Sequence, residues 1–106
     1  MTRLEQLMKY LGDAPNDSFL LFAIAKEHEG LGDIDQAFAY YNRLVTDHPK
    51  DVGTYYHLGK LYEKTENEAA AIEIYTQGMQ IAQQLGERHA HGELATAKMA
   101  ISDDDF

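Results

Sequence analysis

The chain repeats itself at an offset of 34 residues, and this period constrains the fold more than any single motif. The clearest matched positions are Pro15 and Pro49, Asp17 and Asp51, Ala37 and Ala71, and Tyr41 and Tyr75. Between them, Leu21 matches Tyr55, Ile24 matches Leu58, Ala25 matches Gly59, and His28 matches Tyr62. A fixed period of this length is typical of supersecondary units that bury their apolar faces only by stacking on neighbours. Such arrays hold other molecules on their surfaces more often than they form catalytic pockets.

Apolar residues spaced by three and four positions predict six helices. The first helix carries Leu4, Leu7, Met8 and Leu11 and ends at Gly12-Asp13. The second is capped by Asp17 or Ser18 and carries Leu21, Ile24, Ala25 and His28. The third follows Asp33 and carries Ala37, Phe38, Tyr41, Leu44 and Val45. The fourth opens at Asp51 and carries Tyr55, Leu58, Gly59 and Tyr62; the fifth runs from its cap Asn67 to about Leu85; the sixth follows Gly86 and carries Ala90, Leu94, Ala97 and Ile101. We expect His28, on the buried stripe, to pack with a hydrogen-bond partner. No stretch shows strand alternation, so the predicted fold class is all-α.

Composition excludes several functions. The 106 residues suit a single domain, and the absence of cysteine excludes disulfides and thiol chemistry. A net charge of −9 disfavours nucleic acid and anionic membranes as partners. It fits either an ordinary solvated surface or adaptation to high salt. No apolar run is long enough for a membrane span, and the N-terminus lacks a signal-peptide core, so we expect a cytoplasmic protein.

The repeat resembles the tetratricopeptide repeat, a helix-turn-helix unit of 34 residues. Ser18 and Val52 are taken as the first positions of the two units, and the signature positions are four, seven, eight, eleven, twenty and twenty-four. In the first unit these positions hold Leu21, Ile24, Ala25, His28, Ala37 and Tyr41, and in the second they hold Tyr55, Leu58, Gly59, Tyr62, Ala71 and Tyr75. Position thirty-two holds Pro49 in the first unit only. The resemblance implies a short α-solenoid of helix-turn-helix repeats with flanking helices. Its parts are an N-terminal helix over 1–15, repeats over 18–51 and 52–85, a solvating helix over 86–101 and an acidic tail over 102–106.

In this family the first helix of each repeat lines a concave groove. The resemblance therefore implies a peptide-binding groove formed by Phe19, Phe22, Lys26, Glu29, Tyr56, His57, Lys60, Lys64 and, if the last helix keeps the register, His91. An acidic peptide would meet the lysines there, with Phe22 and Tyr56 as apolar anchors. The alternative is that Lys26 and Lys60 only form local ion pairs with Glu29 and Glu63 on a solvated face. The carboxylate clamp known in this family is not reproduced.

Catalytic and metal-binding patterns are absent from the sequence. His89 and His91 are two residues apart, which places them on different faces of a helix, and His57 with His91 would supply only two ligands. We find no phosphate-binding loop and no nucleophile elbow. We therefore expect no enzyme, no cofactor and no metal. The predicted function is a protein-interaction module, or scaffold, that binds an extended and possibly acidic peptide; the alternative is a homo-oligomerisation module, such as a homodimer, with no separate ligand.

Overall fold

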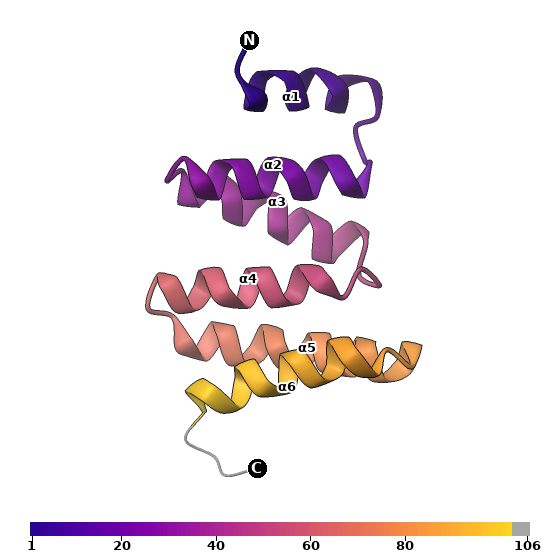
Figure 1. Cartoon of the computed structure of the whole chain (residues 1–106), viewed down its shortest axis with the longest axis vertical. Helices are drawn as coiled ribbons and strands as arrows, with labels where there is room; N and C mark the ends of the chain where they lie inside the picture. Colours follow the sequence, from indigo (N-terminus) through magenta and orange to yellow (C-terminus); the bar gives the residue numbers. More distant parts are fainter. Residues whose placement is uncertain (103–106) are drawn as a thin grey trace. The chain divides into compact units, whose positions relative to one another are not determined.

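The structure, a computed structural model, describes residues 1–102, and the acidic run predicted over 103–106 lies outside the described residues. Over residues 1–102 the elements are six α-helices and no strand, which confirms the all-α class (Figure 1). They are α1 (Arg3–Asp13), α2 (Ser18–Gly30), α3 (Ile34–Asp47), α4 (Gly53–Lys64), α5 (Glu68–Leu85) and α6 (Arg88–Ile101). The chain divides into two compact units, one from Met1 to His48 and one that begins at Pro49.

The helix boundaries follow from capping residues. The side chain of Asp17 accepts a hydrogen bond from the backbone N–H of Leu20 at 3.0 Å, and Asp33 and Asn67 cap α3 and α5 in the same way. Gly86 ends α5 in the left-handed conformation, with φ of 71°, which costs glycine nothing. One predicted start was wrong: α4 begins at Gly53, after Val52, and the carboxylate of Asp51 does not cap it. Asp51 instead contributes its backbone carbonyl, which accepts from the N–H of Thr54 at 3.2 Å.

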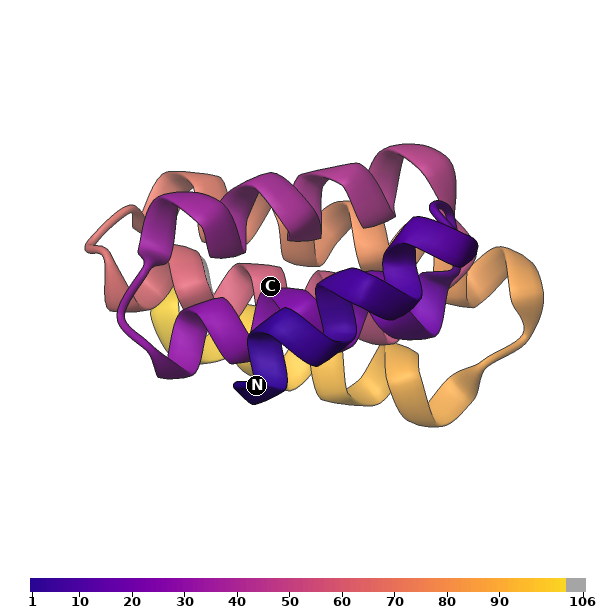
Figure 2. The ribbon, with the colours of Figure 1, turned by 90° about the horizontal axis from the view of Figure 1, so that it is seen from above.

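In the first unit, α2 and α3 form an antiparallel pair and α1 packs against α2 (Figure 2). The buried apolar residues are Leu7, Leu11, Leu21, Ile24, Ala25, Ala37, Tyr41 and Leu44. His28 is buried as predicted and stacks on Tyr40, with ring centroids 5.6 Å apart. The hydrogen bond expected for it is not made at Nδ1, because the nearest carboxylate oxygen of Asp33 is 3.7 Å away, beyond hydrogen-bond range.

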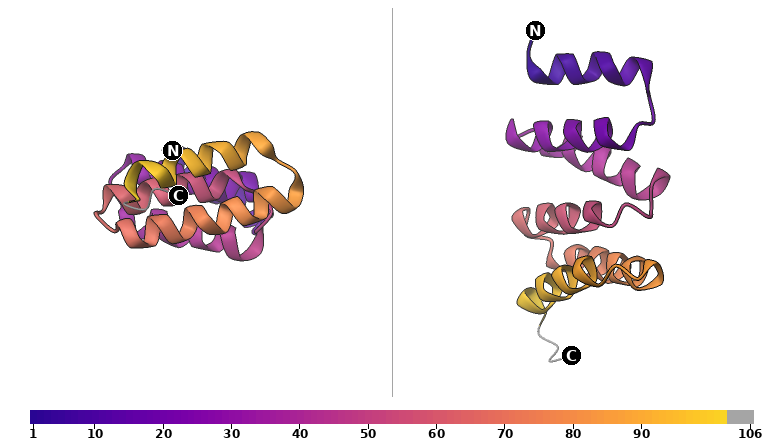
Figure 3. Two further views of the ribbon diagram at one scale, coloured as in Figure 1. Left: turned by 90° about the horizontal axis from the view of Figure 1, so that it is seen from below. Right: turned by 45° about the vertical axis from the view of Figure 1, so that its right-hand side comes forward.

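In the second unit, α4 pairs with α5, and α6 runs back along α5 (Figure 3) while also contacting α4. The buried apolar residues are Tyr55, Leu58, Leu61, Ala71, Tyr75, Ala82, Leu94 and Ala97. Two buried glycines make room for two of the tyrosines. A Cβ on Gly59 would overlap the ring of Tyr75, and a Cβ on Gly78 would stand 2.6 Å from the Cβ of Tyr55. The small residue at position eight of this repeat therefore lies where its two helices approach closely.

Candidate functional site

The first predicted binding face lies on α2. Phe19 is 77% exposed, and Phe22 packs edge-on against Tyr41 with ring centroids 6.2 Å apart. One turn further on, the ammonium of Lys26 lies 3.8 Å from the carboxylate of Glu29. This helix therefore presents one exposed aromatic side chain, Phe19, and one lysine, Lys26, that forms an ion pair with Glu29 on the same helix.

The corresponding face of the second unit lies on α4. The ammonium of Lys60 lies 5.5 Å from the centroid of the Tyr56 ring, within the range of a cation–π interaction, and 3.6 Å from the carboxylate of Glu63. The His57 ring meets the Tyr56 ring edge-on at 5.7 Å, and Lys64 is exposed in the last turn. Both lysines thus make the local ion pairs that the alternative interpretation predicted. Tyr56 and Lys60 also form a combined apolar and cationic surface.

Each of these glutamates also accepts a hydrogen bond from a tyrosine of the following helix. The hydroxyl of Tyr41 donates to Glu29 at 2.9 Å, and the hydroxyl of Tyr75 donates to Glu63. Burial, together with the neighbouring carboxylate, raises the pKa of both Tyr41 and Tyr75, so both phenols stay protonated. The side chain of each glutamate is therefore fixed, and the adjacent lysine is anchored beside a carboxylate that cannot easily turn away.

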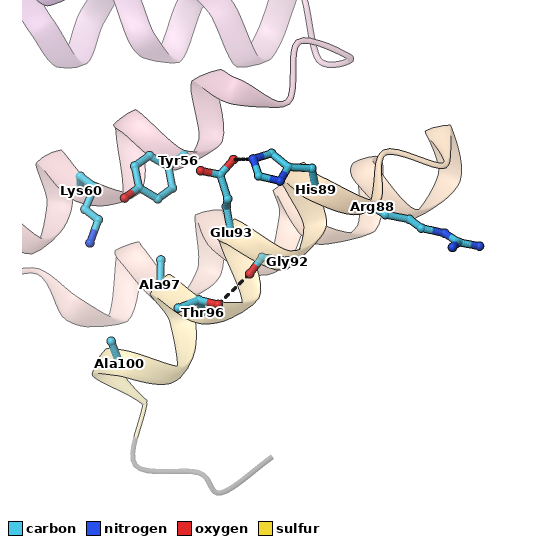
Figure 4. Close-up of a pocket in the computed structure, with 9 residues that line it drawn as sticks. All are labelled: Tyr56, Lys60, Arg88, His89, Gly92, Glu93, Thr96, Ala97 and Ala100. Carbon is cyan, nitrogen blue, oxygen red and sulfur yellow. Dashed lines mark hydrogen bonds and ion pairs between the residues drawn. The ribbon is translucent and has the colours of Figure 1, made fainter.

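Next to Tyr56 and Lys60 the surface is hollowed between α4 and α6 (Figure 4). The hollow measures about 620 Å³, and its lining residues are Tyr56, Lys60, Arg88, His89, Gly92, Glu93, Thr96, Ala97 and Ala100. At one edge, His89 Nε2 lies 3.3 Å from the Glu93 carboxylate, a contact that is an ion pair when the imidazole is protonated. The guanidinium of Arg88 points away from Tyr56 and Lys60.

His91, which the repeat register would place beside the α4 face, lines a different hollow. His91 does not line the hollow between α4 and α6; it lines a smaller one of about 270 Å³ between the end of α5 and the start of α6. From α6, the hollow beside α4 is lined instead by His89, together with Arg88 and Glu93, none of which the repeat pattern indicated. The sequence of α6 does not follow the repeat signature, so its rotation about its own axis could not be read from the period.

Within residues 1–102, no three histidine, aspartate or glutamate side chains come together as a set that could hold a metal ion. None of the helices described there combines the length and apolar character needed to cross a bilayer.

The helix-turn-helix units, their matched spacing and the exposed first helices define a helical-repeat protein of the α-solenoid class. Models of the tetratricopeptide repeat match residues 18–61 and 52–85. Two solved structures confirm the assignment over most of the chain, and the protein belongs to the tetratricopeptide repeat family.

Both structures are of a tetratricopeptide repeat domain protein from Salinibacter ruber. The crystal structure is 40% identical, with a TM-score of 0.73, and the match covers 80% of this chain and 94% of that one. The solution NMR structure is 38% identical, with a TM-score of 0.80, and the match covers 87% of this chain and 94% of that one. No curated protein matched the chain. Repeats of this family generally mediate protein–protein interaction, and proteins built from them are generally non-enzymatic scaffolds.

Proposed function

We propose that the chain binds an extended segment of a partner protein in which an acidic residue lies close to an apolar one. The segment would lie on the first helix of a repeat. On α4 it would meet Tyr56 as an apolar contact and Lys60 as a cationic one, and the corresponding residues of α2 are Phe19, Phe22 and Lys26. The observation that carries the proposal is the position of Lys60 over the Tyr56 ring. It places a positive charge and an aromatic surface so close together that neighbouring residues of one peptide can contact both.

The ion pairs of the lysines do not prevent such binding. The distances of 3.8 Å from Lys26 to Glu29 and 3.6 Å from Lys60 to Glu63 are longer than hydrogen bonds. An ammonium group has three donors, and both lysine side chains are a little under half exposed. Exposed pairs of this kind contribute little free energy, so a ligand carboxylate can approach the lysines at small cost.

Binding would be modest and sensitive to salt. A short peptide on such a surface buries a small area, so we expect a dissociation constant on the order of micromolar. The lysines are partly in water, where charges are screened over about 10 Å at 0.1 M salt. Affinity for an acidic peptide should therefore fall as salt is added, and a neutral analogue should show little change.

The test is a titration with the peptide acetyl-Gly-Asp-Asp-Phe-Gly-amide, followed by backbone amide chemical shifts. The variant Lys26→Gln/Lys60→Gln should lose most of the affinity. Glutamine is preferred to glutamate because a second carboxylate beside Glu29 or Glu63 would repel it and disturb the fold. The matched control is Lys9→Gln/Lys50→Gln, which removes the same charge from two exposed positions that do not line the hollow beside Tyr56.

Two results would contradict the proposal. The first is equal affinity in the two double variants, which would mean that only net charge matters. The second is a set of shifts confined to Tyr40, Arg43 and Ile74 on α3 and α5, which would place the peptide on the second helices. A sedimentation measurement on the same samples shows whether the chain is a monomer. If it is a dimer, and the chemical-shift changes disappear when the dimer dissociates, the homo-oligomer alternative is favoured.

A further inference from the structure

The hollow between α4 and α6 has a floor that lacks large side chains. On the α6 side it is lined by Gly92, Thr96, Ala97 and Ala100, and on the α4 side by Tyr56 and Lys60. The hydroxyl of Thr96 is turned back onto its own helix, where it donates to the carbonyl of Gly92 at 2.9 Å (Figure 4). The floor therefore offers mainly methyl groups and backbone, beside one aromatic ring.

The size of the hollow suits a large side chain. Its volume of about 620 Å³ falls within the range of roughly 300–1,000 Å³ that is usual for ligand pockets. Nothing within 4 Å would meet a Cβ placed on Gly92, so the space over this residue is open. An aromatic side chain placed there would lie on the alanines and beside the Tyr56 ring, and aromatic pairs gain free energy beyond the area they bury when their rings stack offset or meet edge to face.

The rim of the hollow already carries one carboxylate. In Figure 4 the Glu93 side chain lies between Tyr56 and His89, and its carboxylate is 3.3 Å from His89 Nε2. The two side chains are 56% and 93% exposed, so the pair is weak and easily exchanged. Apart from the Tyr56 phenol, the other ionisable groups that line the hollow, Lys60 and Arg88, are cationic. Glu93 therefore occupies the position on His89 that a carboxylate from outside would take.

We propose that this hollow is a subsite for an aromatic side chain of an acidic peptide, and that Glu93 is a specificity-determining residue there. The carboxylate that neighbours the aromatic residue in the peptide replaces Glu93 on His89 and faces Lys60. Glu93 therefore weakens binding of every acidic ligand and sets a requirement for the aromatic contact. The inference rests on the proposed function and adds the class of side chain that the second unit selects.

The test uses the same probe, acetyl-Gly-Asp-Asp-Phe-Gly-amide, and its counterpart with alanine in place of phenylalanine. The variant Gly92→Leu fills the hollow with a side chain that the backbone accepts, since leucine is a better helix former than glycine and its Cβ meets no atom. We expect roughly a tenfold loss of affinity for the phenylalanine probe and little change for the alanine probe. The control Gly12→Leu adds the same side chain to α1, at a glycine whose Cβ would also meet nothing within 4 Å.

Glu93→Gln keeps the shape of the side chain and removes its charge. Both probes should then bind roughly fivefold tighter, because one like charge has left the neighbourhood of the ligand carboxylate. The matched variant Glu68→Gln removes an exposed carboxylate at the start of α5 and should leave affinity unchanged.

The results separate this inference from the proposed function. One outcome is that the lysine variants weaken binding, while Gly92→Leu binds like the wild-type protein and the alanine probe binds like the phenylalanine probe. In that case the peptide binds elsewhere on the first helices and the proposed subsite is wrong. Equal effects of Glu93→Gln and Glu68→Gln would remove the role of Glu93. If the phenylalanine probe binds to none of the proteins, both the proposed function and the subsite are overturned.

Discussion

The hydroxyl of Tyr41 on α3 donates a hydrogen bond to the carboxylate of Glu29 on α2 at a distance of 2.9 Å. The second unit repeats the arrangement one period later, with Tyr75 on α5 donating to Glu63 on α4. In both units the same glutamate also pairs with a lysine three residues before it. A tyrosine from the core of each repeat thus connects the packed interior to the charged residues on its first helix.

Removing either hydroxyl should destabilise the fold. Tyr41→Phe and Tyr75→Phe each leave a partly buried carboxylate without its donor, so we expect a loss of about 1–2 kcal/mol in the free energy of unfolding. Urea denaturation followed by circular dichroism measures this change. Tyr10→Phe, at a residue that is half exposed, is the control and should change stability little. If the two core variants unfold at the wild-type midpoint, the hydrogen bonds to Glu29 and Glu63 contribute nothing net.

Stability should fall in alkaline solution. Burial raises the pKa of Tyr41, Tyr75 and Tyr55 in the folded state, and nearby carboxylates add to the effect. A group whose folded pKa is raised contributes its full stabilisation below the unfolded value, about 10 for tyrosine, and loses it as pH rises above that value. The melting temperature should therefore decline above about pH 10. The double variant Tyr41→Phe/Tyr75→Phe should show a shallower decline, and Tyr10→Phe one as steep as the wild type.

Alanine at the buried glycines should have the opposite effect from alanine at an exposed one. Gly78→Ala brings a methyl group 2.6 Å from the Cβ of Tyr55, which can move only with its backbone, so we expect a loss of roughly 1–3 kcal/mol. Gly92→Ala meets no atom within 4 Å and should gain roughly 0.5–1 kcal/mol, because glycine is a poor helix former. Thermal melts of the two variants compare them directly. Destabilisation by Gly92→Ala would mean that the surface above α6 is not open.

The small residue at position twenty of each repeat should not tolerate a large one. Ala37 and Ala71 are fully buried, so Ala37→Leu and Ala71→Leu should each cost roughly 1–3 kcal/mol through overpacking. Ala39→Leu, on the exposed side of α3, adds the same atoms without burial and is the matched control. Wild-type melting of both core variants would show that the repeat register is wrong.

The sequence alone determined the helices and the family. Capping residues such as Asp17, Asp33 and Asn67 act within one turn of the chain, and buried positions recur with the period of the helix, so both can be read locally. The 34-residue period then fixed which residues of α2 and α4 share a structural position. The period therefore predicts which residues form the α2 face and which form the α4 face.

Only the tertiary structure decided how α6 contributes. Apolar spacing predicted that Leu94 and Ala97 lie on the buried face of this helix, as they do, but it did not indicate which neighbouring helix lies beside each edge of that face. The packing of α6 brings His89 and Glu93 to the hollow beside Tyr56 and turns His91 toward the end of α5. The missing hydrogen bond of His28 was equally hidden, because the distance to Asp33 depends on how the turn between α2 and α3 closes. Local sequence specifies which residues are helical and buried, whereas contacts between helices depend on packing that the period does not encode.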